Sequence, residues 1–109
     1  MANVRHLETT VQRVVTDILR NDVKDDLGFL TVTGVKITNE LSYMYVYYSV
    51  YGDETQMSKT QEALNRANGY IKNQIAHRVK MRKVPELVFK IDESYEKGKR
   101  IDDLIKSIK

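Results

Sequence analysis

The sequence comprises 109 residues, a length that folds as one domain around a single modest core and leaves no room for an active site between two lobes. It contains no cysteine, which excludes a disulfide framework and thiolate chemistry. Its net charge of +3 is mild and favours no class of partner by itself. The first residues lack the apolar core of a signal peptide and no apolar run reaches the length of a membrane span, so we expect a soluble cytoplasmic protein.

The first predicted element is an amphipathic helix over residues 3–21. Apolar residues recur there at spacings of three and four, at Val4, Leu7, Val11, Val14 and Ile18. Such a pattern is typical of a helix that faces a protein core. A helix lying on a membrane surface is the alternative, but basic residues do not flank the apolar positions densely.

Two predicted strands follow and form an antiparallel hairpin. In the first strand the alternation of apolar residues slips by one position at Thr33-Gly34, which predicts a β-bulge. The second strand, residues 43–51, alternates strictly. Its more apolar side, expected under the helices, comprises Met44, Val46, Tyr48 and Val50. Its other side, here called the tyrosine face, comprises Tyr43, Tyr45, Tyr47 and Tyr51.

A long second helix, a third strand and a short terminal helix complete the predicted order αββαβα. The long helix is expected to begin at the cap residue Ser58 and to end near Met81, because the residue before Pro85 disfavours helix. Residues 87–91 alternate as the third strand, and apolar residues between 101 and 108 indicate the terminal amphipathic helix. We therefore expect an α+β fold in which the helices pack on one face of a three-stranded sheet.

The sequence offers no constellation for catalysis or metal binding. Its two histidines, His6 and His77, lie in different predicted elements, with no cysteine to assist them. The adjacent aspartates at 25–26 and at 102–103 have diverging side chains and are expected to be surface residues. The five glycines are too far apart for a phosphate-binding or dinucleotide-binding loop. We therefore expect no enzyme activity, metal, cofactor or small-molecule substrate.

A glycine stands inside the long predicted helix, in the triplet Ala67-Asn68-Gly69. Glycine in a helix interior costs about 1 kcal/mol relative to alanine, so its presence calls for a reason. The helix kinks there, or another group approaches the backbone closely. The alternative is a tolerated glycine in one straight helix.

Basic residues are concentrated between positions 66 and 83, a range called here the basic segment. It holds no acidic residue and carries +6, which leaves −3 for the rest of the chain. Such segregation is typical of proteins that bind polyanions, whereas an ordinary solvated helix face is the alternative. On a helical wheel, Arg66, His77 and Lys80 lie opposite Leu64, which predicts a basic stripe that faces away from the core. The predicted phosphate contacts are Arg66, Lys72, Arg78, Lys80, Arg82 and Lys83.

The tyrosine face has two interpretations. Tyrosines on a sheet can stack unpaired bases, as on sheet-type RNA readers. They are also common in strands, where they pack against neighbouring side chains. We favour packing, because the basic-aromatic signature of an RNA recognition motif is missing. A protein–protein adaptor that docks its partner on this face, and a generic binder of single-stranded RNA, are the two rival functions.

Several stretches resemble the ribosome-binding factor A family of bacteria, in order and in spacing, over nearly the whole chain. They read FLTVTGV at 29–35, VYYSVYGD at 46–53, ANGYIK at 67–72 and VPELVF at 84–89, followed by Asp92-Glu93-Ser94, Gly98, Arg100-Ile101-Asp102 and Leu104. The resemblance implies a single KH-like domain of the bacterial, type II-like kind over residues 1–109. In that family a helix interrupted at Ala-x-Gly, here Ala67-Asn68-Gly69, replaces the usual G-x-x-G loop, which this sequence lacks.

The resemblance also implies a function. Proteins of the family bind the immature small ribosomal subunit near the 5′-terminal helix of its RNA, promote late processing and maturation of that RNA, matter most in the cold and use no cofactor. For this chain we therefore expect a monomer whose partners are the small subunit, its ribosomal RNA and ribosomal proteins. Two departures bear on this expectation: residues 25–28 lack the usual Asp-Pro-Arg turn, and Tyr45 stands where a charged residue is more usual.

Overall fold

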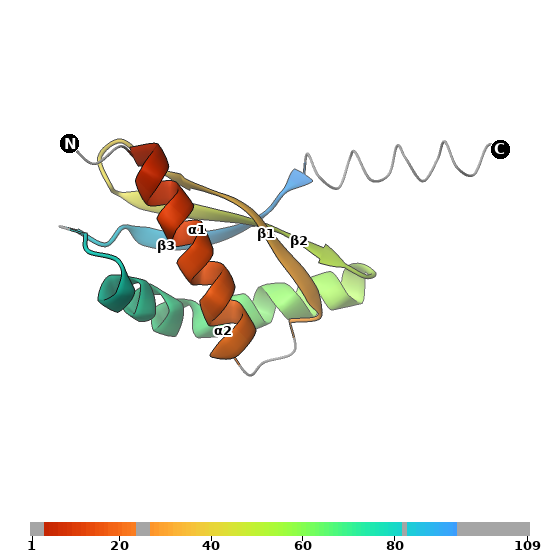
Figure 1. Cartoon of the computed structure of the whole chain (residues 1–109). Coiled ribbons are helices and arrows are strands. Elements are labelled where there is room, and N and C mark those ends of the chain that lie inside the picture. The colour runs from red at the N-terminus through yellow and green to blue at the C-terminus, as the bar shows by residue number, and fades with distance from the viewer. Residues whose placement is uncertain (1–3, 24–26, 82, 94–109) are drawn as a thin grey trace.

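The computed structural model describes residues 4–23, 27–81 and 83–93, in which five elements follow the predicted order (Figure 1). They are helix α1 (Val4–Asn21), strands β1 (Phe29–Ile37) and β2 (Tyr43–Tyr51), helix α2 (Glu54–Arg78) and strand β3 (Glu86–Ile91). These bounds confirm the predicted hairpin, the long second helix and the third strand. The predicted terminal helix lies outside the described residues, as does Arg82.

The sheet has the strand order β1-β2-β3. β1 and β2 pair antiparallel, and β3 pairs parallel to β2 after α2 has carried the chain back along the sheet. The register of β1 shifts between Val32 and Gly34, which confirms the predicted bulge. The extra residue, Thr33, donates its hydroxyl to the carboxylate of Asp92 at 2.7 Å. Because Asp92 follows β3, this hydrogen bond links the two outer strands across β2.

Both helices cover the same face of the sheet and enclose the core. Every second residue of β2 from Met44 to Val50 is buried under them, as the alternation predicted. The buried sides of the two helices supply Val11, Val15, Ile18, Leu64, Ile71 and Ile75. The apolar periodicity of α1 and α2 is therefore explained by burial against one side of the sheet.

Tyr48 is the largest of the fully buried side chains. Its hydroxyl donates to the side-chain carbonyl of Gln61 in α2, and its ring meets that of Phe89 edge-on with centroids 6.4 Å apart. Burial raises the pKa of the Tyr48 hydroxyl, because the phenolate would lose its hydration. Tyr48, which lies in β2, thus contacts both α2 and β3.

Helix α1 also protects the outer edge of the sheet. The carboxylate of Glu8 accepts the backbone N–H of Ile37 at 2.7 Å, and the side-chain amide of Gln12 donates to the carbonyl of Val32 at 3.3 Å. Both backbone groups belong to β1, whose other side is occupied by β2. An edge strand with occupied backbone groups is a poor template for pairing with another chain.

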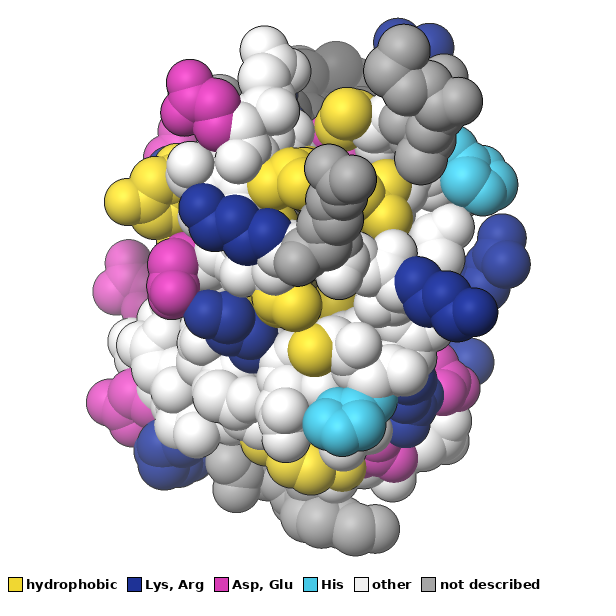
Figure 2. Space-filling view, turned by 90° about the vertical axis from the view of Figure 1, so that its left-hand side faces the viewer, with side chains coloured by type: hydrophobic (Ala, Val, Ile, Leu, Met, Phe, Trp, Pro, Cys, Tyr) yellow, Lys and Arg dark blue, Asp and Glu magenta, His cyan; other side chains and the backbone are white. Residues whose placement is uncertain are grey.

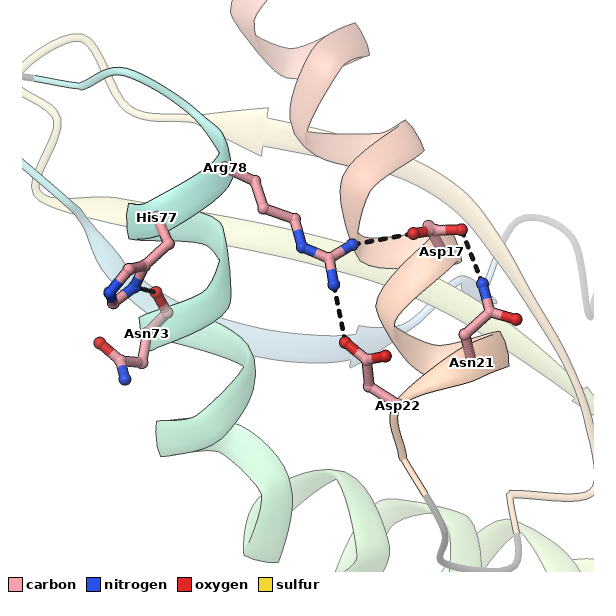
Figure 3. A network of polar contacts seen from close by, with 6 residues as sticks. All are labelled: Asp17, Asn21, Asp22, Asn73, His77 and Arg78. Carbon is pink, nitrogen blue, oxygen red and sulfur yellow. Dashed lines mark hydrogen bonds and ion pairs between the residues drawn. The ribbon is translucent and has the colours of Figure 1, made fainter.

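Helix α2 differs from the prediction at three points. It begins earlier, because the side chain of Asp53 rather than Ser58 caps it by accepting the N–H of Gln56 at 2.9 Å. It ends at Arg78, three residues before Met81, where Val79 turns into extended backbone. The predicted interruption at Ala67-Asn68-Gly69 is wrong, because α2 is helical throughout this triplet. The ribbon bends part-way along its course without a break (Figures 1 and 3).

The continuity of α2 has a packing reason. Leu64 and Ile71 are both fully buried and lie seven residues apart, about two helical turns, so an unbroken helix keeps them on one side. A Cβ atom added at Gly69 would meet no atom within 4 Å, so no neighbour forces the backbone to open. The glycine is therefore tolerated at an exposed position of one continuous helix.

Candidate nucleic-acid interface

The residues of the triplet Ala67-Asn68-Gly69 have separate roles. Ala67 packs against the core, and Gly69 is exposed. The side-chain amide of Asn68 donates to the backbone carbonyl of Leu87 at 2.9 Å. Leu87 lies in β3 at a position whose polar backbone groups point away from β2, since its neighbour Glu86 donates its own N–H to Ser42 on the β2 side. Asn68 thus fastens α2 to the outer edge of β3, a role that the sequence pattern did not reveal.

Arg78 holds the two helices together (Figure 3). Its guanidinium donates to Asp17 of α1 and to Asp22 just after α1, each at 2.8 Å. Asp17 in turn accepts a hydrogen bond from Asn21 at 2.7 Å. A guanidinium that bridges two carboxylates is already neutralised, so a phosphate would have to displace one of them. Arg78 lies in the basic segment, but its charge is used to join the two helices.

Lys72 is paired as well. Its ammonium lies 2.9 Å from the carboxylate of Glu86, at the start of β3. The side chains are 31% and 68% exposed, so the pair is hydrated and contributes little to stability. It nevertheless lowers the positive potential near Lys72, which makes this lysine a weaker phosphate ligand than its charge suggested.

The predicted single basic stripe does not form. Arg66, Lys72 and Arg78 are spaced by six residues, or about 240° around a helix, so they point in three different directions. Arg66 and His77 do face away from the core, opposite the buried Leu64, as predicted. Figure 2 shows the end of the molecule that includes the last turns of α2, where Lys and Arg side chains are interspersed with hydrophobic, histidine and acidic ones.

What remains outward-facing on α2 is a mixed polar and aromatic surface. We call it the α2 surface and define it by Arg66, Tyr70, Asn73 and His77, all of which are exposed. Tyr70 is 47% exposed, and His77 is held by a 2.7 Å hydrogen bond between its Nδ1 and the carbonyl of Asn73. A shallow groove beside it is lined by Gly69, Tyr70, Lys72, Asn73, Ala76 and Val84.

The α2 surface continues into the connection between α2 and β3. Lys80 and Lys83 are exposed there, beyond the last turn of the helix, and Arg82 between them lies outside the described residues. Flexible lysine ammoniums beside an exposed tyrosine and an arginine can contact phosphates and stack on a base. This combination suits a nucleic-acid backbone better than a small ligand.

Three features of other kinds of site are absent from the described residues. No group of three or more His, Asp or Glu side chains in this part of the chain is placed to hold a metal ion. Neither of the two described helices combines the length and the apolarity needed to cross a bilayer. Every buried side-chain nitrogen or oxygen in the described part has a hydrogen-bond partner.

Comparison with known proteins identifies relatives over most of the chain. The family model of ribosome-binding factor A matches residues 3–105. The ribosome-binding factor A of Halothermothrix orenii is 42% identical over 106 residues, which are 96% of this chain and 87% of that protein. The protein of the same name from Staphylococcus epidermidis is 39% identical over 111 residues, covering 99% and 96% of the two chains.

Solved structures give the same result. The crystal structure of ribosome-binding factor A from Thermus thermophilus superposes with a TM-score of 0.74 at 28% identity, covering 83% of this chain and 97% of that one. A homology model of the Thermus thermophilus protein, fitted into the cryo-EM map of its complex with the 30S subunit, gives a TM-score of 0.67 at 28% identity, covering 83% and 96%.

Proposed function

The chain belongs to the ribosome-binding factor A family, and from this premise we propose that it binds the small ribosomal subunit as an assembly factor. The main support for this proposal is the outward-facing α2 surface with Lys80 and Lys83 beside it. These residue types are the ones that contact the phosphate backbone of nucleic acids. The Thermus thermophilus relative that was fitted into a 30S complex supports the choice of partner.

The finer proposal is that the chain acts on the immature subunit. It would bind near the 5′-terminal helix of the ribosomal RNA, promote late processing and maturation of that RNA, and matter most in the cold. We propose that it does so as a cytoplasmic monomer with one KH-like domain, without a cofactor and without covalent chemistry of its own. Binding energy alone can favour one RNA conformation, because a ligand shifts an equilibrium towards the state that it binds better.

The proposed RNA contacts fall into two groups. Arg66, Lys80, Arg82 and Lys83 are assigned to direct phosphate contact. Lys72 and Arg78 are assigned an indirect role, because Glu86 and the two α1 aspartates already hold them. Removing a direct contact should weaken binding and reduce its salt dependence, since each neutralised phosphate releases counterions.

Co-sedimentation with immature small subunits tests this assignment. Lys80→Glu and Lys83→Glu, singly and together, are compared with Lys59→Glu, which makes the same charge change on the exposed first half of α2. We expect each single variant to weaken binding about tenfold and the control to bind like the parent. Circular dichroism confirms that each variant is folded. A folded double variant that pellets as well as the parent contradicts the assignment.

Salt dependence separates RNA binding from the adaptor alternative. Binding through phosphates should fall steeply between low and physiological salt, whereas an aromatic protein interface should change little. Mature subunits provide the second comparison, because an assembly factor should pellet preferentially with the immature form. Equal pelleting with both forms would contradict the maturation part of the proposal and leave subunit binding intact.

A further inference from the structure

Among the described residues, the face of the sheet that α1 and α2 leave uncovered carries an organised set of aromatic and basic side chains. Because side chains alternate along a strand, the tyrosine face of β2 shares this side with every second residue of β1 and β3. The register places Lys36 beside Tyr45 on one flank and Lys90 beside Tyr47 on the other. Phe29 lies beside Tyr51 at the far end of the same face.

One end of this face is a preformed stack. The rings of Tyr43 and Tyr45 are stacked, with centroids 5.9 Å apart and planes inclined by 18°. The ammonium of Lys90 lies 4.7 Å from the centroid of the Tyr45 ring. A cation over a partly exposed ring is held only weakly, so Lys90 can exchange this contact for a phosphate. Tyr43 ends the stack and is 46% exposed, which leaves room for a further ring.

The opposite end is also aromatic and open. Phe29 is 81% exposed and Tyr51 is 67% exposed, although large aromatic side chains are normally mostly buried. Tyr43 and Tyr51 lie eight residues apart in one strand, which corresponds to about 27 Å. The face therefore has an exposed aromatic group at each end, and between the two ends one lysine lies on each side of β2. This arrangement is an elongated platform rather than a pocket.

Acidic side chains on this face are engaged elsewhere. Glu86, beside Tyr43, is paired with Lys72 of α2. Asp92, beyond the end of β3, accepts the hydroxyl of Thr33 and keeps its negative charge. With Lys36 and Lys90 the face therefore carries a small net positive charge, which favours an anionic partner over a cationic one.

We propose that this uncovered face binds a short segment of unpaired RNA, with bases stacking at Tyr43 and at the Phe29–Tyr51 end and with Lys36 and Lys90 contacting phosphates. This inference rests on the proposed RNA-binding function and assigns it a second surface, on the side of the sheet opposite the helices. Stacking on aromatic rings tolerates any base, so the platform would recognise single-strandedness rather than sequence. A duplex, whose bases are already stacked, would not use it.

Fluorescence anisotropy with a labelled 12-nucleotide oligouridine, which has no stable secondary structure, tests the platform. Tyr43→Ala removes the terminal ring and should weaken binding about tenfold, whereas Tyr43→Phe keeps the ring and should bind like the parent. Lys36→Ala with Lys90→Ala should make the plot of log affinity against log salt shallower by about 1.4, since each phosphate contact to a single strand contributes about 0.7. Lys59→Ala, a lysine on α2, is the matched control and should leave the slope unchanged.

The outcomes separate this inference from the function on which it rests. If the parent pellets with immature subunits but Tyr43→Ala and the parent bind oligouridine equally, the platform is wrong and subunit binding stands. If Tyr43→Ala loses subunit binding in a salt-insensitive way while oligouridine binding is unchanged, the face docks a protein and the RNA assignment is overturned. If the parent binds neither subunits nor oligouridine, both proposals fail.

Discussion

Substituting neighbouring residues of the triplet in α2 should change stability in opposite directions. In Gly69→Ala the added Cβ atom would meet nothing within 4 Å, and the positive-φ glycines in the described chain are Gly28 and Gly52, so alanine fits without strain. Alanine is better than glycine in a helix interior by about 1 kcal/mol. We therefore expect Gly69→Ala to raise the free energy of unfolding by about 1 kcal/mol and the melting temperature by about 4 °C.

Asn68→Ala removes the 2.9 Å hydrogen bond to the carbonyl of Leu87. Such a bond contributes about 0.5–1.5 kcal/mol, while the better helix propensity of alanine offsets up to about 0.7 kcal/mol of the loss. The net result should be a loss of about 0.5 kcal/mol. The two variants therefore differ by about 1.5 kcal/mol although they are adjacent in sequence.

Urea unfolding followed by circular dichroism measures both values, with Ala76→Gly at another exposed helical position as a control that should lose stability. A Gly69→Ala variant that is less stable than the parent would refute the continuous helix. A more stable Gly69→Ala variant that no longer pellets with subunits would show that the glycine serves close approach of the RNA.

Two further predictions concern the contacts that join α1, α2 and the sheet. Arg78→Ala should lower the free energy of unfolding by about 1 kcal/mol at low salt and by less in 1 M salt, because the ion pairs of Arg78 are partly exposed and are screened by salt. Equal losses at the two salt concentrations would show that packing rather than charge is responsible. Because burial raises the pKa of Tyr48, the folded state holds that proton more tightly than the unfolded chain does. The parent should therefore lose stability as the pH rises above about 10. Tyr48→Phe should lack this part of the loss when the free energy of unfolding is compared at neutral and alkaline pH. An equal change in the free energy of unfolding with pH in both proteins would contradict the prediction.

The elements were predictable because their signals are local. Strict alternation located β2, and a glycine at a phase slip located the bulge at Gly34. The start of α2 was misplaced because the sequence holds two good caps. Ser58 has Gln61 three residues later, which is the spacing of a capping box, but Asp53 lies only two residues after the end of β2 and caps the helix there. The interruption at Gly69 was predicted from the family resemblance, and the packing of Leu64 and Ile71 on one side of a continuous helix overrides that prediction.

The site was only partly predictable, because a helical wheel gives the direction of a side chain and not what it meets. Arg78 reaches carboxylates 61 and 56 residues away in sequence, and Lys72 reaches Glu86 across to β3. No periodicity encodes these pairs. These ion pairs neutralise two charges of the basic segment. Lys36 and Lys90 come from strands that are far apart in sequence, and the sheet places both of them at the tyrosine face.

The lysines proposed to contact RNA therefore lie at two separate places. Lys80 and Lys83 lie in the connection between α2 and β3, whereas Lys36 and Lys90 lie on the uncovered face of the sheet. Substitutions at sites that are separated in this way, and that share no contacting residue, have additive effects on the free energy of binding. If both surfaces hold the same immature subunit, the factors by which Lys80→Glu and Tyr43→Ala weaken pelleting should multiply in the double variant. A double variant no weaker than the worse single one would mean that the subunit uses one surface at a time.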